Sequence, residues 1–205
     1  MNQLESLITR VRQTEHGFTD IRRAADELTK HESREAQAVL AHQLILSDVP
    51  QARMLATFLF GGLAAKDADH LTFLHERVSR DADWRVQEIL AQAFDQFCKE
   101  TGYEAALPVI DAWLHDSHPH VRRAVTEGLR IWTGREYFCD HPEVAIRLLS
   151  QLKADESEYV RKSVGNALRD ISRKHKDLIR AELEKWDLLD KHIKQTYKFA
   201  SRFLD

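Results

Sequence analysis

Two carboxylates and one guanidinium lie at positions in this chain from which they could act together. Arg123 and Glu127 are four residues apart in the segment DSHPHVRRAVTEGLRIW, residues 116–132, and on a helix this spacing projects both side chains from one face. Glu88 holds the position of Arg123 in an earlier, similar segment. Carboxylates held near a cationic side chain can stay ionised or keep a proton as a reaction requires. These residues are therefore the first candidates for catalysis.

The same residues also allow a simpler interpretation. Arg123 and Glu127 could form an ordinary intrahelical ion pair, which contributes only about 0.3–0.5 kcal/mol when it is exposed. Which interpretation holds depends on whether this face of the helix contacts water, a neighbouring helix or a ligand. This in turn depends on how the helices of the chain are arranged.

Apolar residues recur at the helical spacing of three and four almost everywhere, as in Leu4, Leu7, Ile8 and Val11. No segment alternates with the period of a strand. Caps and helix breakers divide the chain into about twelve helices of roughly ten to twenty residues. We expect residues 116–132 to form one of them.

The helices also repeat. The segments DADWRVQE, DSHPHVRRA and DESEYVRKS align an aspartate with a valine five residues later, and the same frame extends in both directions. The anchor residues of this frame are Ile21, Ala52, Val86, Val121, Val160 and Ile193. A period near 35 residues with two helices per unit is typical of an α-solenoid, and the Asp and Val-Arg pattern is typical of HEAT repeats. We predict an all-α fold, a right-handed α-solenoid of about six HEAT-like repeats in a single domain, residues 1–205, in which the aspartates cap the second helices.

The interval between the anchors Val121 and Val160 is the longest, and the surplus falls in GREYFCDHP, residues 134–142. Loops on one face of a solenoid often bind ligands. Alternatively, this loop is a linker whose aromatic residues fold back on the core.

Positions two and six residues after each anchor share another face of the second helix. Stacking the second helices would place five polar residues side by side on the inner, concave wall: Glu88, Arg123, Glu127, Lys162 and Asn166.

The net charge of −3 is unevenly distributed, because residues 158–205 carry twelve Lys and Arg against eight Asp and Glu. A basic surface near the C-terminus fits a polyanionic partner, although solvated helix faces would give the same count. The candidates for phosphate contacts are Arg161, Lys162, Arg169, Lys194 and Lys198.

Several classes of site are not expected. The only two cysteines, Cys98 and Cys139, form no CxxC or Cys/His pattern, so neither a disulfide framework nor a zinc site is indicated. The histidines around Pro119 match no metal-ligand spacing. We expect no metal and no cofactor, no signal peptide or membrane span, and a reducing, cytoplasmic location.

The segments ADWRVQE, HVRRAVTEGLRIWT and YVRKSVGNALRDIS resemble the HEAT-like repeat DNA glycosylases of the AlkC and AlkD group, the bacterial DNA alkylation repair enzymes. The resemblance is good over roughly residues 80–204. It implies removal of alkylated, positively charged bases such as 3-methyladenine or 7-methylguanine, with little or no base flipping in the AlkD branch. A cationic base is a good leaving group, so a carboxylate that stabilises the sugar cation and orients water would suffice.

By this resemblance, Trp84 matches the family's tryptophan at the lesion strand and Glu88 stands at the catalytic aspartate of the AlkD branch. Arg123 matches the arginine that grips the DNA backbone. Glu127 matches a carboxylate characteristic of the AlkC branch, and Trp132 matches a further aromatic residue of that branch. The chain departs from the AlkD branch by Glu in place of Asp at 88 and by Asn166 in place of a tryptophan. The extra immunoglobulin-like domain of some AlkC members is not expected.

We therefore predict a monomeric, monofunctional DNA glycosylase of base excision repair that acts on double-stranded DNA without a cofactor, in the bacterial cytoplasm and at the nucleoid when bound. Glu88 and Glu127 would be catalytic. The DNA contacts would come from Trp84, Arg123, Lys162, Asn166, Trp132 and Arg161. One alternative is a non-catalytic HEAT-repeat protein that recognises damaged or branched DNA, and another is a protein-binding scaffold.

Overall fold

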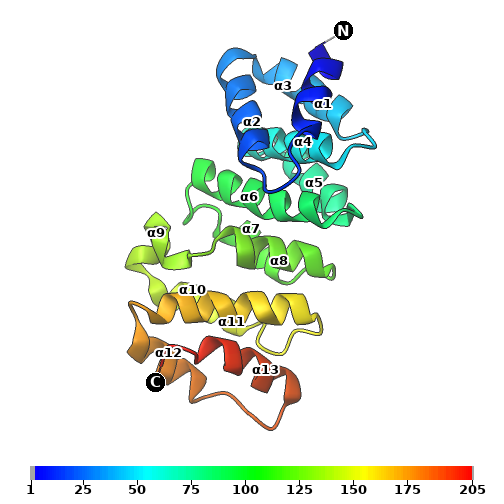
Figure 1. Ribbon diagram of the computed structural model, residues 1–205. Helices are drawn as coiled ribbons and strands as arrows, with labels where there is room; N and C mark the ends of the chain where they lie inside the picture. Colours follow the sequence, from blue (N-terminus) through cyan, green and yellow to red (C-terminus); the bar gives the residue numbers. More distant parts are fainter. Residues whose placement is uncertain (1–2, 205) are drawn as a thin grey trace. The chain divides into compact units, whose positions relative to one another are not determined.

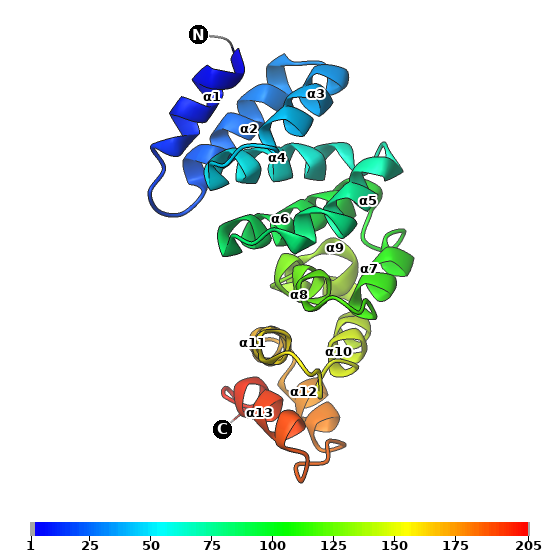
Figure 2. The ribbon, with the colours of Figure 1, turned by 90° about the vertical axis from the view of Figure 1, so that its right-hand side faces the viewer.

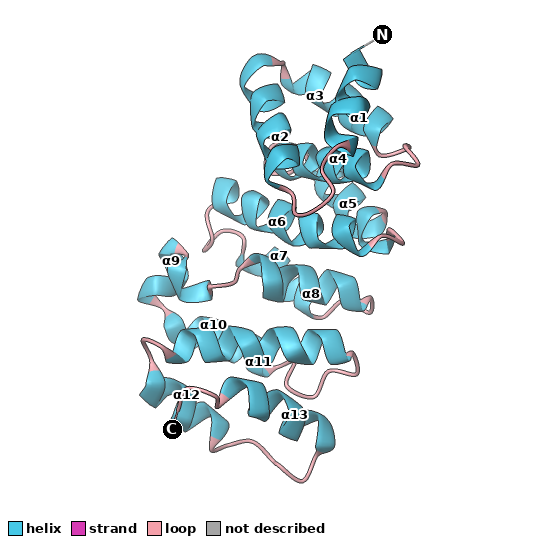
Figure 3. Ribbon diagram, in the orientation of Figure 1, coloured by secondary structure: helices cyan, strands magenta, loops and turns pink. Residues whose placement is uncertain are grey.

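The structure, a computed structural model, describes residues 3–204, and every regular element within this range is helical (Figure 3). The chain forms two compact units, Met1–Thr101 and Gly102–Asp205. No helix in the described range has the length and hydrophobicity to span a bilayer. The all-α prediction is confirmed.

Unit 1 contains three helix pairs (Figure 1). They are α1 (Gln3–Arg12) with α2 (Thr19–His31), α3 (Arg34–Leu44) with α4 (Pro50–Leu63), and α5 (Ala68–Glu76) with α6 (Trp84–Thr101), the last pair joined through the 3₁₀ turn η1 (Val78–Arg80). The second helices form one layer, since α4 packs against both α2 and α6. The predicted anchors Ile21, Ala52 and Val86 are fully buried in this unit.

Unit 2 repeats the arrangement with α7 (Leu107–Leu114) and α8 (Pro119–Gly128), α10 (Pro142–Ser150) and α11 (Glu158–Ser172), and α12 (Lys176–Leu183) and α13 (Lys191–Ala200). Helix α11 packs against α8 and α13, and Figure 2 shows α8 and α11 end-on in one layer with α7 and α10 in the other. The anchors Val121, Val160 and Ile193 are buried. Six pairs in the described range agree with the predicted six repeats of an α-solenoid.

The repeated aspartates have a different role from the one predicted. Asp116 accepts a hydrogen bond from the backbone N–H of His118 at 2.6 Å, and Asp155 accepts one from that of Ser157 at 2.8 Å. His118 and Ser157 are themselves the N-cap residues of α8 and α11. The aspartates therefore close the turn before the cap instead of capping the helix.

These turns are tied to the preceding helix by arginines that follow the anchors. Arg122 donates two hydrogen bonds to Asp155, at 2.6 and 2.8 Å, and two more to the carbonyls of the loop before α8. Arg53 does the same to Asp81 in unit 1, at 2.7 and 3.1 Å. Because each guanidinium joins two successive loops, the Val-Arg pattern is explained by structure alone.

The helix predicted for residues 116–132 is shorter than expected, because α8 ends at Gly128. Trp132 begins the 3₁₀ turn η2 (Trp132–Gly134) and is fully buried, with its indole Nε1 donating to the carbonyl of Thr126 at 3.4 Å. Arg135 donates to the carbonyl of Gly128. The side chains of Trp132 and Arg135 thus donate hydrogen bonds to carbonyls that the end of the helix leaves without a backbone partner.

The long loop after α8 folds onto unit 2. It contains the additional short helix α9 (Glu136–Asp140), and Phe138 is fully buried against Trp132 and Tyr137, with ring centroids 5.0 and 5.4 Å apart. Of the two interpretations of residues 134–142, the structure supports the one in which aromatic residues fold back on the core.

Candidate functional site

The first turn of α6 carries two of the predicted site residues, Trp84 and Glu88, on one face of the helix. The side chain of Trp84 is 69% exposed. Trp84 is therefore not part of the hydrophobic core.

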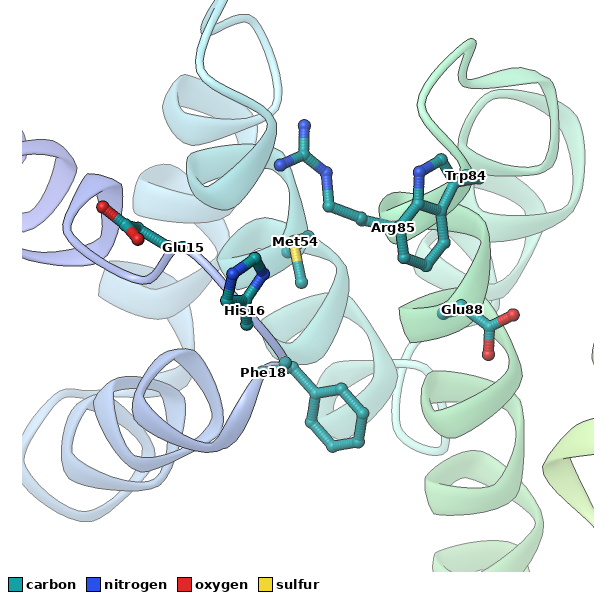
Figure 4. Close-up of a pocket in the computed structure, with 8 residues that line it drawn as sticks. Glu15, His16, Phe18, Met54, Trp84, Arg85 and Glu88 are labelled. Carbon is teal, nitrogen blue, oxygen red and sulfur yellow. The ribbon is translucent and has the colours of Figure 1, made fainter.

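A pocket of about 330 Å³ lies beside this turn, entirely within unit 1 (Figure 4). Its lining comes from three elements: residues 15–18 of the loop between α1 and α2, Met54 of α4, and Trp84, Arg85 and Glu88 of α6. Figure 4 shows the α1–α2 loop facing the first turn of α6, with Met54 between them. The pocket therefore combines aromatic, thioether and charged groups.

The guanidinium at the pocket has a dedicated counterion. Arg85 donates to both carboxylate oxygens of Asp83, at 2.7 and 2.9 Å. These hydrogen bonds outweigh the burial of the carboxyl group and lower the pKa of Asp83 below its ordinary value. The lining also includes the carboxylates of Glu15 and Glu88.

The loop wall of the pocket is fixed by aromatic packing. The ring of Phe18 lies 6.2 Å from that of Phe58 on α4. The guanidinium of Arg22 lies over both rings, 5.6 and 5.0 Å from their centroids. Phe18 is thus held in place from α2 and α4.

In unit 2, α8 carries Arg123 and Glu127, and α11 carries Lys162 and Asn166. Glu127 pairs with Arg130, three residues later, at 3.5 Å. The Glu127 side chain is only 20% exposed. Its carboxylate therefore has a counterion within the same unit, Arg130, which the repeat pattern did not predict.

Arg130 also reaches the neighbouring helix. It donates to Asp170 at 2.8 Å, and Asp170 accepts further bonds from Arg169, which donates to Asn166 at 2.9 Å. Burial acts to raise the pKa of Asp170, but the hydrogen bonds from Arg130 and Arg169 outweigh it and hold this pKa below its ordinary value. A chain of polar contacts therefore links Glu127 to Asn166.

Three predicted DNA contacts are at odds with the structure. Trp132 is fully buried, so it has no face for a ligand. Arg161 is 7% exposed and donates to Gln195 at 2.7 Å and to the carbonyl of Glu156. The guanidinium of Arg169 is held by Asp170 and Asn166. These side chains stabilise unit 2.

The exposed lysines remain as candidates for phosphate contacts. Lys162 is 46% exposed and pairs with Glu158 at 2.6 Å, a contact that lowers the pKa of Glu158. Lys194 and Lys198 are exposed on α13. Within residues 3–204, no group of three or more His, Cys, Asp or Glu could hold a metal ion.

The residues on the loop side of the pocket were not predicted from the sequence. His16 and Phe18 lie in a stretch of helix breakers before α2, where no periodic pattern indicates a side-chain direction. Met54 lies two residues after the anchor Ala52, at one of the positions that the repeat pattern assigned to the inner face of the second helices. The convergence of Glu88 with Glu127 remains a prediction, because the two residues belong to different units.

Proteins of known structure have a similar fold. Over 98% of the chain the structure is similar to AlkD2 from Streptococcus mutans, with 52% identity, a TM-score of 0.96 and 97% of that protein covered. It is also similar to Pseudomonas fluorescens alkylpurine DNA glycosylase AlkC bound to DNA containing an abasic site analog, with 27% identity and a TM-score of 0.52 over 97% of this chain and 61% of AlkC.

A third relative is the Bacillus subtilis protein YhaZ, 37% identical over 97 residues, which are 45% of this chain and 27% of YhaZ. The chain thus matches only about a quarter of the length of that curated relative. The family model described as DNA alkylation repair enzyme matches residues 16–203. Over residues 16–203, which include Trp84 and Glu88, the chain belongs to the DNA alkylation repair enzyme family.

Proposed function

We propose that this protein is a monofunctional DNA glycosylase that removes alkylated, positively charged bases, such as 3-methyladenine or 7-methylguanine, from double-stranded DNA. The observation that carries the proposal is the exposed Trp84 beside Glu88 at a pocket in a chain of the DNA alkylation repair family. DNA as the partner is supported by the similar AlkC, whose structure contains DNA with an abasic site analog.

The reaction is hydrolysis of the N-glycosidic bond. The base leaves with the bonding electron pair, which neutralises its charge, and water adds to C1′ of the sugar while its proton passes to solvent. Glu88 would stabilise the positive charge that develops on the sugar and orient the water. Trp84 would hold the lesion through contacts with its ring face.

Affinity for the duplex would come from the C-terminal basic residues. Lys162, Lys194 and Lys198 are exposed in unit 2, and Arg123 on α8 is a further candidate by resemblance. Phosphate neutralisation makes binding weaken steeply as salt rises. We further propose that the protein acts as a monomer in the bacterial cytoplasm.

The proposal is tested by incubating the protein with methylated duplex DNA and measuring released 3-methyladenine and 7-methylguanine. We expect release by the wild type. The charge of the leaving base matters in this mechanism, so a duplex with only unmodified bases should lose none.

A second candidate function is recognition of damaged DNA without base removal. It is favoured by the pairing of Glu127 with Arg130, because this carboxylate is already compensated and less able to stabilise a new cation. Fluorescence anisotropy with labelled duplexes separates the two candidates. Tight binding of methylated DNA at low salt without any base release would favour the second candidate.

A further inference from the structure

A second pocket in unit 1, the α3–α5 pocket, has the size of a small-ligand site. Its volume is about 400 Å³, within the range of roughly 300–1,000 Å³ that such sites span. The lining comes from the C-terminal part of α3 and the loop after it, from α5, and from η1 with the residues that flank it. It has no residue in common with the pocket beside Trp84. The α3–α5 pocket is therefore a separate candidate site.

Aromatic and aliphatic side chains form most of the walls of the α3–α5 pocket. The rings of His42 and Phe73 meet edge to face, with centroids 5.3 Å apart. Both rings pack on the fully buried Phe60 of α4, at 5.0 and 4.7 Å between centroids. The aliphatic part of the lining is Ile45, Leu46 and Val78. Such a lining makes favourable contacts with the faces and edges of a flat apolar ring.

Leu46 leaves apolar surface in contact with water at this pocket. It is 80% exposed, although it belongs to the lining. A ligand that covers Leu46 would remove this surface from water, which is favourable. Leu46 therefore favours a ligand that is apolar over most of its surface.

The α3–α5 pocket has one positive charge without a counterion. Its carboxylate, Asp81, is bound by Arg53, which donates to both carboxylate oxygens at 2.7 and 3.1 Å. Arg77 is exposed, and no residue within 3–204 forms a hydrogen bond or an ion pair with its guanidinium. The guanidinium of Arg77 is therefore available to an anion.

We propose that the α3–α5 pocket binds a small carboxylic acid whose remaining part is an apolar ring. The ring would lie against His42 and Phe73, and the carboxylate would accept two parallel hydrogen bonds from Arg77. The single guanidinium balances one negative charge, which favours a carboxylate over a phosphate monoester with its charge of nearly two. The proposal goes beyond the proposed function, because the pocket contains neither Trp84 nor Glu88.

The test is a ligand-detected NMR titration of the full chain with 2-naphthoate and with its neutral amide, 2-naphthamide. The two probes share one ring system and differ in charge. At pH about 8 histidine is largely neutral, so Arg77 supplies the unpaired positive charge at the pocket. We expect saturable binding of 2-naphthoate with an apparent Kd at least about tenfold below that of 2-naphthamide.

Variants identify the site. Arg77→Gln should lower the affinity for 2-naphthoate to that for 2-naphthamide, a loss of about tenfold, and leave binding of the amide unchanged. Leu46→Ser should weaken binding of both compounds by about threefold, because it removes apolar contact. Arg34→Gln makes the same change of charge at the first residue of α3, outside the lining, and should have no effect. Circular dichroism verifies that each variant is folded.

Trp84→Phe distinguishes the two pockets of unit 1. It should leave binding of 2-naphthoate unchanged, and a loss in this variant in place of Arg77→Gln would mean that the compound occupies the other pocket. Displacement of 2-naphthoate by an unmodified duplex would assign Arg77 to a DNA-binding surface. Either result, the absence of saturable binding of 2-naphthoate, or equal affinity for the acid and the amide would overturn the proposal.

Discussion

Arg130 joins two acidic residues of unit 2, and its position shows how a neighbouring helix decides a side chain's partner. The sequence pattern paired Glu127 with Arg123 at a spacing of four, but the ion pair in the structure is with Arg130 at a spacing of three. Arg130 lies beyond the end of α8 and is oriented by Asp170 on α11. Periodicity predicted which residues share a face, but it carries no information about a partner set by tertiary contact.

The low pKa of Asp170 makes the stability of unit 2 depend on pH. The pKa of such a carboxyl group is about 4 in the unfolded chain and lower in the native state. The group therefore stabilises the native state above pH about 4, and this contribution is lost as the pH falls through the lower, native-state pKa. We expect Asp170→Asn to lower the free energy of unfolding at pH about 7 by about 1–3 kcal/mol, because Arg130 and Arg169 lose their acceptor.

Urea denaturation of the wild type and Asp170→Asn, at neutral pH and at pH about 3, measures the loss in the free energy of unfolding. The difference between the two proteins should shrink in acid. Asp177→Asn is the control, since the side chain of Asp177 is 98% exposed. A constant difference at both pH values would show that the charge of Asp170 does not stabilise the fold.

For the helices, the anchors correctly predicted which faces are buried. The ends of the helices could not be predicted in the same way, because they depend on tertiary contacts. All six anchors are buried. The predicted helix through Trp132 failed because Trp132 packs into the core with Phe138, a contact that no local pattern reveals. The loop wall of the candidate site was missed for the same reason, since Phe18 is positioned by Phe58 and Arg22.

Two adjacent glycines on α4 test the packing of unit 1. A Cβ added at Gly61 would lie 2.7 Å from Cα of Ala93 on α6, whereas one at Gly62 would meet no described atom within 4 Å outside its own helix. We expect Gly61→Ala to destabilise the protein by about 1–3 kcal/mol through overpacking. Gly62→Ala should be neutral or stabilise by up to about 1 kcal/mol, because alanine favours a helix.

Thermal and urea unfolding of the two variants provide the comparison. An equal loss of stability in Gly61→Ala and Gly62→Ala would mean that α4 and α6 are less closely packed than the structure has them.

The ion pair between Arg122 and Asp155 is a second test at this scale. Its side chains are 13% and 4% exposed, and the arginine also holds the loop before α8. We expect Arg122→Met to cost about 3–5 kcal/mol, because it leaves a buried carboxylate without its counterion. Arg180→Met removes an arginine whose side chain is 50% exposed and should cost less than about 1 kcal/mol. Similar losses in both variants would contradict a structural role for the repeated arginine.

For the whole molecule, the repeat period predicted six helix pairs because each pair needs its neighbours to bury its apolar face. The same logic assigned Glu88 and Glu127 to equivalent faces of their repeats. Each residue has a different setting in its own unit: Glu88 lines a pocket, and Glu127 is paired with Arg130. Its place at a pocket beside the exposed Trp84 makes Glu88 the stronger candidate for catalysis.

The most direct measurement is the single-turnover rate of 7-methylguanine release from a methylated duplex, at protein in excess over DNA. We expect release by the wild type and a rate at least about 100-fold lower in Glu88→Gln, as for removal of one group that stabilises a transition-state charge. Glu143→Gln, at a 63% exposed carboxylate on α10, should match the wild type. Release at the wild-type rate by Glu88→Gln would contradict catalysis by Glu88, and no release by the wild type would contradict glycosylase activity.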